Sequence, residues 1–269
     1  MTQKVTALID ADGLVYATGA VAETVSYAVG DLHFDYKSQA NEYVESNGLS
    51  KEDIEKVVDA QPVSHALNAA RTALDSILEQ TKADEYEIYL SNLDKDNFRL
   101  HIYPEYKANR KNAHRPKHFH AIRNWFKNQK TAVETRGLEP DDLIAIRAHE
   151  IGAMGNKFII VTNDKDMQQI AGDHYNPRTK KFEFIKPYDA LHNLYMQILV
   201  GDSIDNIKGC PGIGPAKART ALRGAETEEE MLEAAYAEYV KAYSNDEKAA
   251  KAAFELNARL VQLIQRRPE

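Results

Sequence analysis

The sequence predicts an α/β fold built around a mainly parallel sheet, and three observations predict it. Short apolar, β-prone runs alternate with helical patterns, as in a series of βαβ units. Acidic residues follow several of these runs, where parallel strands present their carboxyl ends. The composition, 43% apolar and 28% charged over 269 residues, is that of an ordinary globular protein and excludes disordered and collagen-like chains.

The first strand is expected at residues 5–9, a short apolar run that ends at Asp10. Residues 30–60 are polar and indicate irregular structure. From Val63 the apolar residues recur at helical spacing, which indicates an amphipathic helix. The remaining expected elements are a strand at 87–90, a helix at 140–151, strands at 158–161 and 182–185, and helices from about Asp189 onward.

The predicted organisation is an α/β core over residues 1–198 and a mainly helical part over residues 199–269. Cys210 is the only cysteine, which excludes an intramolecular disulfide and any multi-cysteine metal site. No apolar stretch approaches the roughly 20 residues of a membrane span, and the N-terminus lacks a signal-peptide pattern. We therefore expect a cytoplasmic protein with no membrane partner. The formal net charge is 34 − 41 = −7, which would normally argue against a nucleic-acid partner. The argument fails if the acids are gathered in one place, where they can bind metal ions.

Ten carboxylates recur at predicted strand ends and helix starts. Each one alone is also consistent with a turn residue or with a charge that favours a helix start. If the strand ends converge, the acids repel one another unless cations neutralise them, and an oxygen-only ligand set favours Mg²⁺ or Mn²⁺ over zinc. On a helix Asp141 and Asp142 would point about 100° apart, and Asp202 and Asp205, at i and i+3, would share a face. That geometry can serve two ions in phosphodiester hydrolysis. The ten are Asp10, Asp12, Asp94, Glu139, Asp141, Asp142, Asp164, Asp166, Asp202 and Asp205.

A basic stretch occupies residues 107–130, with eight Lys or Arg, no acid, and aromatic rings in or beside it. It is consistent with a solvated helix face, or with a segment that follows phosphates while its rings stack on unpaired bases. Pro116 is expected to break it into two pieces.

A glycine-rich hairpin occupies residues 209–214. Gly212 and Gly214 permit a tight turn whose N–H groups can face a phosphate, and Ile213 is expected to insert into the hairpin's own core. A plain loop remains an alternative. The small residues that follow, with Lys217 and Arg219, make the segment similar to a helix-hairpin-helix that binds the duplex backbone without reading sequence.

Parts of the chain also look like the motifs of haloacid-dehalogenase phosphatases. In that alternative Asp10 is the nucleophile and Asp12 the general acid/base. The alternative leaves Glu139, Asp141, the basic stretch and the glycine hairpin without a role. A DNA-binding module without enzymatic activity explains the basic stretch but not the acids.

An ordered set of motifs covers nearly all of residues 5–220. The set is Leu8-Ile-Asp10 with Leu14-Val-Tyr16, Tyr106-Lys-Ala-Asn-Arg110, Gly137-Leu-Glu-Pro-Asp-Asp142, Thr162-Asn-Asp-Lys-Asp166, Gly201-Asp-Ser-Ile-Asp-Asn206 and Gly212-Ile-Gly214. It resembles the 5′-nuclease (flap endonuclease) superfamily, in particular the 5′→3′ exonucleases of tailed phages and the 5′-nuclease domains of bacterial DNA polymerase I. The resemblance fades beyond Arg223, where the acidic helices are expected to be structural.

The resemblance implies a PIN-like nuclease core, a helical arch at about 101–130, and a helix-three-turn-helix element at about 201–220. It implies a monomer that hydrolyses phosphodiester bonds at the 5′ ends of duplex DNA, including flaps, in replication or repair. RNA/DNA hybrids, through primer removal, and replication proteins are further implied partners. The implied cofactors are two Mg²⁺ ions, which Mn²⁺ can replace, and a K⁺ ion at the glycine hairpin. For a phage-encoded chain the compartment would be the host cytoplasm.

The resemblance also implies roles for individual residues. Lys107 and Arg110 would act on the scissile phosphate or the threaded 5′ end, and the ring of Tyr106 would stack. The family places one further aspartate before Phe98-Arg99 at a variable distance; Asn92 and Asp94 both fit, and we choose Asp94. Asp12 is not general to the family. The implied metal ligands are Asp10, Asp94, Glu139, Asp141, Asp142, Asp164, Asp166, Asp202 and Asp205, and the implied DNA contacts are Lys111, Arg115, Lys117, Gly212, Ile213, Gly214 and Lys217.

Overall fold

The computed structural model describes residues 3–94, 96–112 and 114–266. The chain divides into two compact units, which are described separately. The first unit comprises Met1–Ala11, Ile77–His114 and Gln129–Glu269, and the second comprises Asp12–Ser76 and Arg115–Asn128. The boundary expected near residue 198 lies inside the first unit, because helix α7 (Pro187–Val200) packs against residues on both sides of it.

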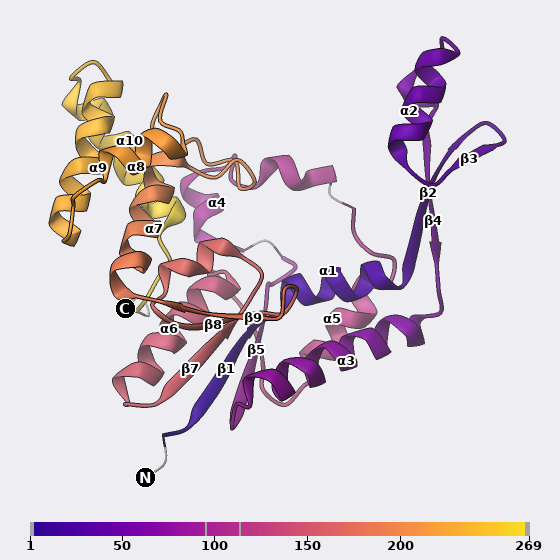
Figure 1. Ribbon diagram of the computed structural model, residues 1–269, viewed down its shortest axis with the longest axis horizontal. Helices are drawn as coiled ribbons and strands as arrows, with labels where there is room; N and C mark the ends of the chain where they lie inside the picture. The colour runs from indigo at the N-terminus through magenta and orange to yellow at the C-terminus, as the bar shows by residue number, and fades with distance from the viewer. Residues whose placement is uncertain (1–2, 95, 113, 267–269) are drawn as a thin grey trace. The chain divides into compact units, whose positions relative to one another are not determined.

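The first unit is built on a six-stranded sheet in the order β6-β5-β1-β7-β8-β9 (Figure 1). Every neighbouring pair is parallel except β8 and β9, so the prediction of a mainly parallel α/β fold is confirmed. The pattern missed β8, whose sequence Gly-Asp-His-Tyr-Asn carries little apolar signal. The strands are β1 (Val5–Asp10), β5 (Glu85–Leu90), β6 (Ala132–Glu134), β7 (Lys157–Val161), β8 (Gly172–Asn176) and β9 (Lys181–Ile185).

The buried strand β1 lies at the centre of the sheet. Leu8 pairs with Glu87 of β5 on one side and with Ile160 of β7 on the other. Ala7, Leu8 and Ile9 are fully buried, which explains why this strand is a continuous apolar run. Because the central strands are parallel, Asp10 at the end of β1 and the residues after β7 lie at the same edge of the sheet.

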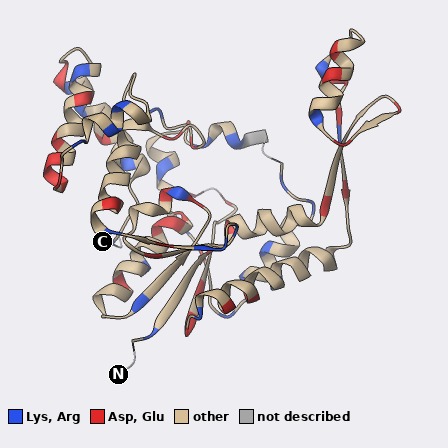
Figure 2. Cartoon of the chain, in the orientation of Figure 1, with Lys and Arg blue, Asp and Glu red and all other residues tan. Residues whose placement is uncertain are grey.

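Helix α6 packs against β1, β5 and β7, and forms one apolar core of the first unit with them. A second core is formed mainly by the later helices, among which α7, α9 and α10 pack on one another. Acidic residues are frequent on α9 (Figure 2). The helices of this unit are α4 (Phe98–Ile102), η2 (Ala108–Asn112), α6 (Pro140–Ala153), η3 (Lys165–Gln169), α7 (Pro187–Val200), α8 (Pro215–Ala221), α9 (Glu228–Ala242) and α10 (Glu247–Val261).

The second unit contains a three-stranded antiparallel sheet in the order β3-β2-β4. The expectation of irregular structure over residues 30–60 is therefore wrong. Its apolar residues, among them Val29, Ala40 and Val44, form a small core only after the chain folds back, so no local period shows it. The elements are α1 (Ala11–Val21), β2 (Glu23–Val29), β3 (Leu32–Phe34), α2 (Lys37–Ser46), η1 (Lys51–Asp53), β4 (Glu55–Ala60), most of α3 (Val63–Thr81) and α5 (Phe119–Lys127).

Within the described residues, every helix is too short or too polar to cross a lipid bilayer.

Candidate active site

The carboxyl edge of the first unit's sheet gathers acids from four places in the sequence. Thr162, which follows β7, connects two of them: its hydroxyl donates to Asp10 Oδ2 (3.0 Å) and accepts the N–H of Asp164 (3.0 Å). Asp141 enters from the first turn of α6, and Asp202 from the turn after α7. We call Asp10, Asp141, Asp164, Asp166 and Asp202 the acid-rich group.

Burial and negative neighbours together set the electrostatics of the acid-rich group. Burial, together with the charges of Asp10, Asp164 and Glu139, holds the pKa of Asp141 well above its ordinary range. Burial, the charges of Asp164 and Asp202, and a hydrogen bond with Asp202 raise the pKa of Asp166 to about 7. Ionising all five carboxylates together is therefore unfavourable until positive charge is added.

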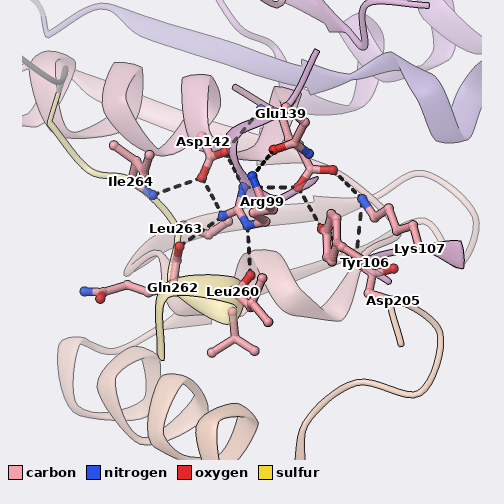
Figure 3. A network of polar contacts seen from close by, with 12 residues as sticks. Arg99, Tyr106, Lys107, Glu139, Asp142, Asp205, Leu260, Gln262, Leu263 and Ile264 are labelled. Carbon is pink, nitrogen blue, oxygen red and sulfur yellow. Dashed lines mark hydrogen bonds and ion pairs between the residues drawn. The ribbon is translucent and has the colours of Figure 1, made fainter. Parts of the chain in front are cut away.

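A second group of carboxylates is already paired with cations. At its centre lies Arg99, whose side chain is 2% exposed (Figure 3). Its Nη1 and Nη2 donate to Asp142 Oδ2 (2.6 Å) and Oδ1 (2.9 Å), and Nη1 also donates to Glu139 Oε2 (3.1 Å). Burial opposes the charge of Arg99, but the hydrogen bonds and charge of Asp142 outweigh it and raise the pKa of the guanidinium.

Lys107 and Arg110 complete this ion-paired group. The ammonium of Lys107 donates to Glu139 Oε1 and lies 3.5 Å from Asp205 Oδ2, while Arg110 pairs with Asp205 Oδ1. Burial opposes ionisation of Glu139, but the charges of Lys107 and Arg99 prevail and lower its pKa. Lys107 has a left-handed φ of 56°, which is uncommon for a residue other than glycine. Its backbone N–H donates to the backbone carbonyl of Asp205 (2.9 Å). The ion-paired group is thus Glu139, Asp142 and Asp205 with Arg99, Lys107 and Arg110.

Tyr106 links the two carboxylates that Lys107 touches. Its hydroxyl lies 2.8 Å from Glu139 Oε2 and 3.1 Å from Asp205 Oδ2, and it donates its single proton to one of them at a time. The residue is only 4% exposed, so the expectation that its ring stacks on a substrate base is wrong. The core of the later helices covers the ring.

Asp142 does not fit the role of metal ligand that the sequence motif implied. Its side chain is fully buried, and beyond the two Arg99 bonds it accepts the N–H of Glu139 (3.1 Å) and of Ile264 (3.1 Å). Both oxygens therefore hold two hydrogen bonds each. Asp142 closes the first turn of α6 and anchors Arg99, a role that the adjacent Asp141 does not share.

The structure also shows the surroundings of Asp202, Asp205, Asp94 and Asp12. Asp202 and Asp205 do not share a helix face, because Asp202 pairs with Ile207 across a short antiparallel bridge and the residues between them form a turn. Asp94 is exposed, and its backbone N–H donates to Asn92 Oδ1 (3.0 Å). The choice between Asn92 and Asp94 stays a prediction. Asp12 lies in the first turn of α1, in the second unit.

The donor set of the acid-rich group suits a hard divalent cation. It offers only oxygen, and burial together with neighbouring carboxylates raises the pKa of Asp141 and of Asp166, so a bound cation would stabilise their ionised forms. In the part of the chain that the structure describes, no three His, Cys, Asp or Glu side chains lie in positions to share one metal ion. The acid-rich group therefore suits a metal ion by the chemistry of its ligands and by its charge, and not by a preformed coordination geometry.

The glycine hairpin follows α7. Gly201 and Gly209 allow the two ends of the loop between α7 and the hairpin to meet, since a Cβ at Gly201 would lie 2.5 Å from Gly209 N and one at Gly209 would lie 2.5 Å from Gly201 N. Gly212 has a left-handed φ of 75°, whereas Gly214 is extended, so only Gly212 needs the conformational freedom of glycine. Ile213 is partly buried and packs against the core of the later helices.

The basic stretch divides at Pro116 as expected, into η2 and α5. Arg115 and Lys117 are exposed, and the Arg115 guanidinium lies 4.7 Å from the ring centroid of Phe119. Phe119 itself is 6% exposed and is unavailable for stacking on a base. The side chain of Lys111 lies outside the described residues. Because the stretch belongs to both units, the helical arch stays a prediction.

Sequence reasoning missed several supporting residues. The sequence gives Arg99 no role, because its partners Glu139 and Asp142 lie 40 and 43 residues further along the chain. Gln197 donates to Asp166 Oδ1 (2.9 Å) and accepts from Gln169. Their polar side chains on helices carry no local signal.

Comparison with known proteins decides the family. Residues 50–193, just over half of the chain, match the family model described as 5′-3′ exonuclease, N-terminal resolvase-like domain. The chain belongs to this family. The resemblance to the 5′-nuclease superfamily is therefore confirmed, and the phosphatase alternative loses its support.

Individual relatives agree with this family. A 5′-3′ exonuclease of Buchnera aphidicola is 31% identical, over 59% of this chain and 58% of its own length. The flap endonuclease Xni of Vibrio parahaemolyticus is 29% identical, over 68% of this chain and 76% of its own length. DNA polymerase I of Rhizobium leguminosarum is 31% identical over 51% of this chain, which corresponds to only 15% of the polymerase.

Solved structures share the fold of this family member. The 5′-exonuclease of T5 superposes with a TM-score of 0.61 at 16% identity, covering 97% of this chain and 89% of its own. A T5 D15 flap endonuclease complex with DNA and metal ions gives a TM-score of 0.56 at 16% identity, over 94% and 99% of the two chains. The expected nuclease-type α/β fold is confirmed.

Proposed function

We propose that this chain is a divalent-metal-dependent 5′-nuclease that hydrolyses phosphodiester bonds at the 5′ ends of duplex DNA, acting as a 5′→3′ exonuclease and on flaps. Family membership and the names of the relatives support the reaction class. The T5 flap endonuclease of the same fold, which forms a complex with DNA and metal ions, supports the substrate and the cofactor type. We propose Mg²⁺ as the natural ion, with Mn²⁺ as a substitute.

The observation that carries the proposal is the acid-rich group at the carboxyl edge of the sheet. Two divalent ions bound there would activate the attacking water and neutralise charge on the phosphate. Asp10, Asp141, Asp164, Asp166 and Asp202 are the residues that would hold them. Glu139 and Asp205 could contribute only by exchanging an ion pair for a metal bond, and Asp142 is assigned to holding Arg99.

Lys107 and Arg110 are the residues placed to receive a phosphate. Both reach carboxylates of the site, and both retain exposed surface, with side-chain exposures of 29% and 45%. A phosphate oxygen can replace a carboxylate oxygen as their partner, so Lys107 can stabilise negative charge as it grows in the transition state. Tyr106 holds Glu139 and Asp205 beside them rather than contacting a base.

Duplex anchoring is proposed for the glycine hairpin and the basic stretch. Gly212, Ile213, Gly214 and Lys217 would contact the sugar-phosphate backbone, with a K⁺ ion at the hairpin, and Lys111, Arg115 and Lys117 would follow the 5′ strand. No Cβ at Gly212 or Gly214 would meet a protein atom within 4 Å, so the space in front of the turn is open. We further propose a cytoplasmic monomer that also acts on RNA/DNA hybrids and works with replication proteins.

The proposed function is tested by digesting 5′-labelled flap, nicked and blunt duplexes with Mg²⁺ and reading product lengths. The expected result is release of short 5′ products that stops in excess chelator and with Asp141→Asn. Release of inorganic phosphate from small phosphomonoesters without DNA cleavage, or full DNA cleavage in chelator, would overturn the proposal.

The hairpin's role has a separate test. Gly214→Val adds a side chain into open space on an extended backbone, so the fold should be retained and any effect should report on ligand approach. We expect weaker duplex binding and a less defined cleavage position, with slow cleavage of short single strands preserved. Unchanged duplex binding and cleavage positions would show that the hairpin is only a structural turn.

A further inference from the structure

Residues 260–264, which we call the C-terminal strap, continue from the end of α10 across the ion-paired group (Figure 3). Every residue of the strap contributes one backbone hydrogen bond to a side chain of the site or of its support. Leu260 O and Gln262 O accept from Arg99 Nε (2.8 Å) and Nη2 (3.0 Å), Val261 O accepts from Gln169 Nε2 (2.9 Å), Leu263 N donates to Gln169 Oε1 (3.2 Å), and Ile264 N donates to Asp142 Oδ1 (3.1 Å).

The local physics of a helix end explains the first contacts. The last carbonyls of an α-helix have no partner within the helix and carry partial negative charge. Leu260 and Val261 are the last two residues of α10, and Arg99 and Gln169 supply the missing donors. With its bonds to Glu139 and Asp142, Arg99 then donates from all three of its nitrogens.

Two chains of hydrogen bonds connect the strap to carboxylates of both groups. The first chain passes through Arg99 to Glu139 and Asp142. The second passes through Gln169 to Gln197, whose Nε2 donates to Asp166 Oδ1 (2.9 Å). Gln169 is 6% exposed, so displacing it would leave buried polar groups without partners.

The strap's own side chains fix its backbone in place. Leu260 and Val261 are buried in the core of the later helices, whereas Leu263 is buried in the core between α6 and the sheet. The two cores of the first unit are therefore joined through the same residues whose backbone holds Arg99 and Gln169. The strap's hydrogen bonds end on Arg99, which contacts Glu139, and on Gln169, which is connected to Asp166 through Gln197.

We infer that the C-terminal strap is a positioning element of the nuclease site, which holds Glu139 through Arg99 and Asp166 through Gln169 and Gln197. The inference rests on the proposed function, and it gives a role to a segment beyond the point where the sequence motifs end. The strap touches neither substrate nor reacting atoms; it acts by setting where the carboxylates lie. Partners of this kind typically change metal affinity or turnover by roughly 10–100-fold when removed.

The test replaces Gln169 by Leu, with Gln168→Leu as the matched control. Gln168 is the neighbouring glutamine of η3, and its side chain donates to Glu183 (3.1 Å) rather than to the strap. For Gln169→Leu we expect turnover on saturating flap DNA to fall by roughly 10–100-fold with KM for DNA nearly unchanged. Calorimetry with Mn²⁺ alone, without DNA, should show an affinity about tenfold weaker. Gln168→Leu should match the wild type in all three quantities.

Wild-type turnover and wild-type Mn²⁺ affinity in folded Gln169→Leu would overturn the inference. If the wild-type chain cleaves no DNA while Gln169→Leu weakens Mn²⁺ binding, the proposed function fails and the strap still positions a cation site. The outcomes of the two proposals are therefore distinguishable.

A second measurement uses the wild-type chain and avoids any folding defect. If the strap positions the carboxylates that bind the cation, cation binding must stabilise the strap in return. The amides of Leu263 and Ile264 should exchange hydrogen several-fold more slowly with saturating Mn²⁺ than in chelator. Equal exchange rates at these two amides, beside slower exchange at Asp164 or Asp166, would overturn the inference.

Discussion

The acid-rich group and the ion-paired group both contain buried carboxylates, but only the ion-paired group also contains basic side chains, and at Asp205 burial still outweighs the charges of Lys107 and Arg110 and raises the pKa. Burial and like charges raise the pKa of Asp141 and Asp166, whereas Lys107 and Arg99 lower the pKa of Glu139 in spite of its burial. Asp141 and Asp142 are adjacent in sequence and fall on different sides of this division. The comparison shows that proximity to a site does not define a ligand: a carboxylate whose lone pairs are filled by the protein supports the site, and one surrounded by other carboxylates is available to a cation.

The largest expected effect comes from Asp141→Asn, which removes one charge from the acid-rich group. DNA cleavage should fall by more than about 100-fold, because the transition-state stabilisation that a metal ligand supports amounts to several kcal/mol. Stability in chelator should rise, since like-charge repulsion is relieved. Single-turnover cleavage and urea unfolding in chelator measure the two quantities. A loss of stability in Asp141→Asn would contradict the division between the groups.

The adjacent substitution, Asp142→Asn, should act mainly on stability. Arg99 and Asp142 are almost completely buried, and removing one charge of such a pair typically costs about 3–5 kcal/mol. Urea unfolding of the two Asn variants side by side measures the contrast. If both variants have the same stability, Asp142 is not the structural partner of Arg99.

Replacing Lys107 by Met should move Glu139 and Asp205 towards the behaviour of the acid-rich group. Both lose a counter-charge, so Mn²⁺ should bind more tightly while turnover falls by about tenfold or more. Calorimetry and single-turnover kinetics separate the two effects. Lys82→Met is the control, because Lys82 is exposed and also has a left-handed φ, of 49°. Weaker Mn²⁺ binding in Lys107→Met would show that Lys107 does not compete with the cation.

The smallest expected effect is a pH dependence of stability from Asp166. Its pKa rises from an ordinary value of 3.8 to about 7 in the folded chain. The folded state therefore keeps a proton that the unfolded state releases near pH 4. Keeping this proton favours the folded state fully below about pH 4, and the advantage is lost as the pH rises towards 7. In chelator, wild-type stability should fall over this interval, and Asp166→Asn should flatten the fall. If Asp166→Asn leaves the pH dependence of stability unchanged, the pKa of Asp166 is not raised by its neighbours in the acid-rich group.

Local sequence determined the strands β1, β5, β7 and β9 and the positions of most acids. Residues 5–10 and 157–161 are apolar runs that end in Asp10 and lead to Asp164, and parallel pairing brings such ends to one edge. The helix expected at 140–151 is α6, and a capping box between Glu139 and Asp142 stabilises its start. These features depend on contacts within a few residues, which is why a sequence pattern can predict them.

Tertiary structure alone decided what each carboxylate does. Sequence treats Asp141 and Asp142 alike, but a helix turns by about 100° per residue, so one side chain faces Asp10 and Asp164 while the other meets Arg99 and Ile264. Tyr106, which looks like a stacking ring in the sequence, is covered by the core of the later helices. The C-terminal strap is invisible in the sequence because it binds through backbone atoms, which every residue carries. Charge state and backbone contacts depend on which distant segments meet, and only the folded chain determines that.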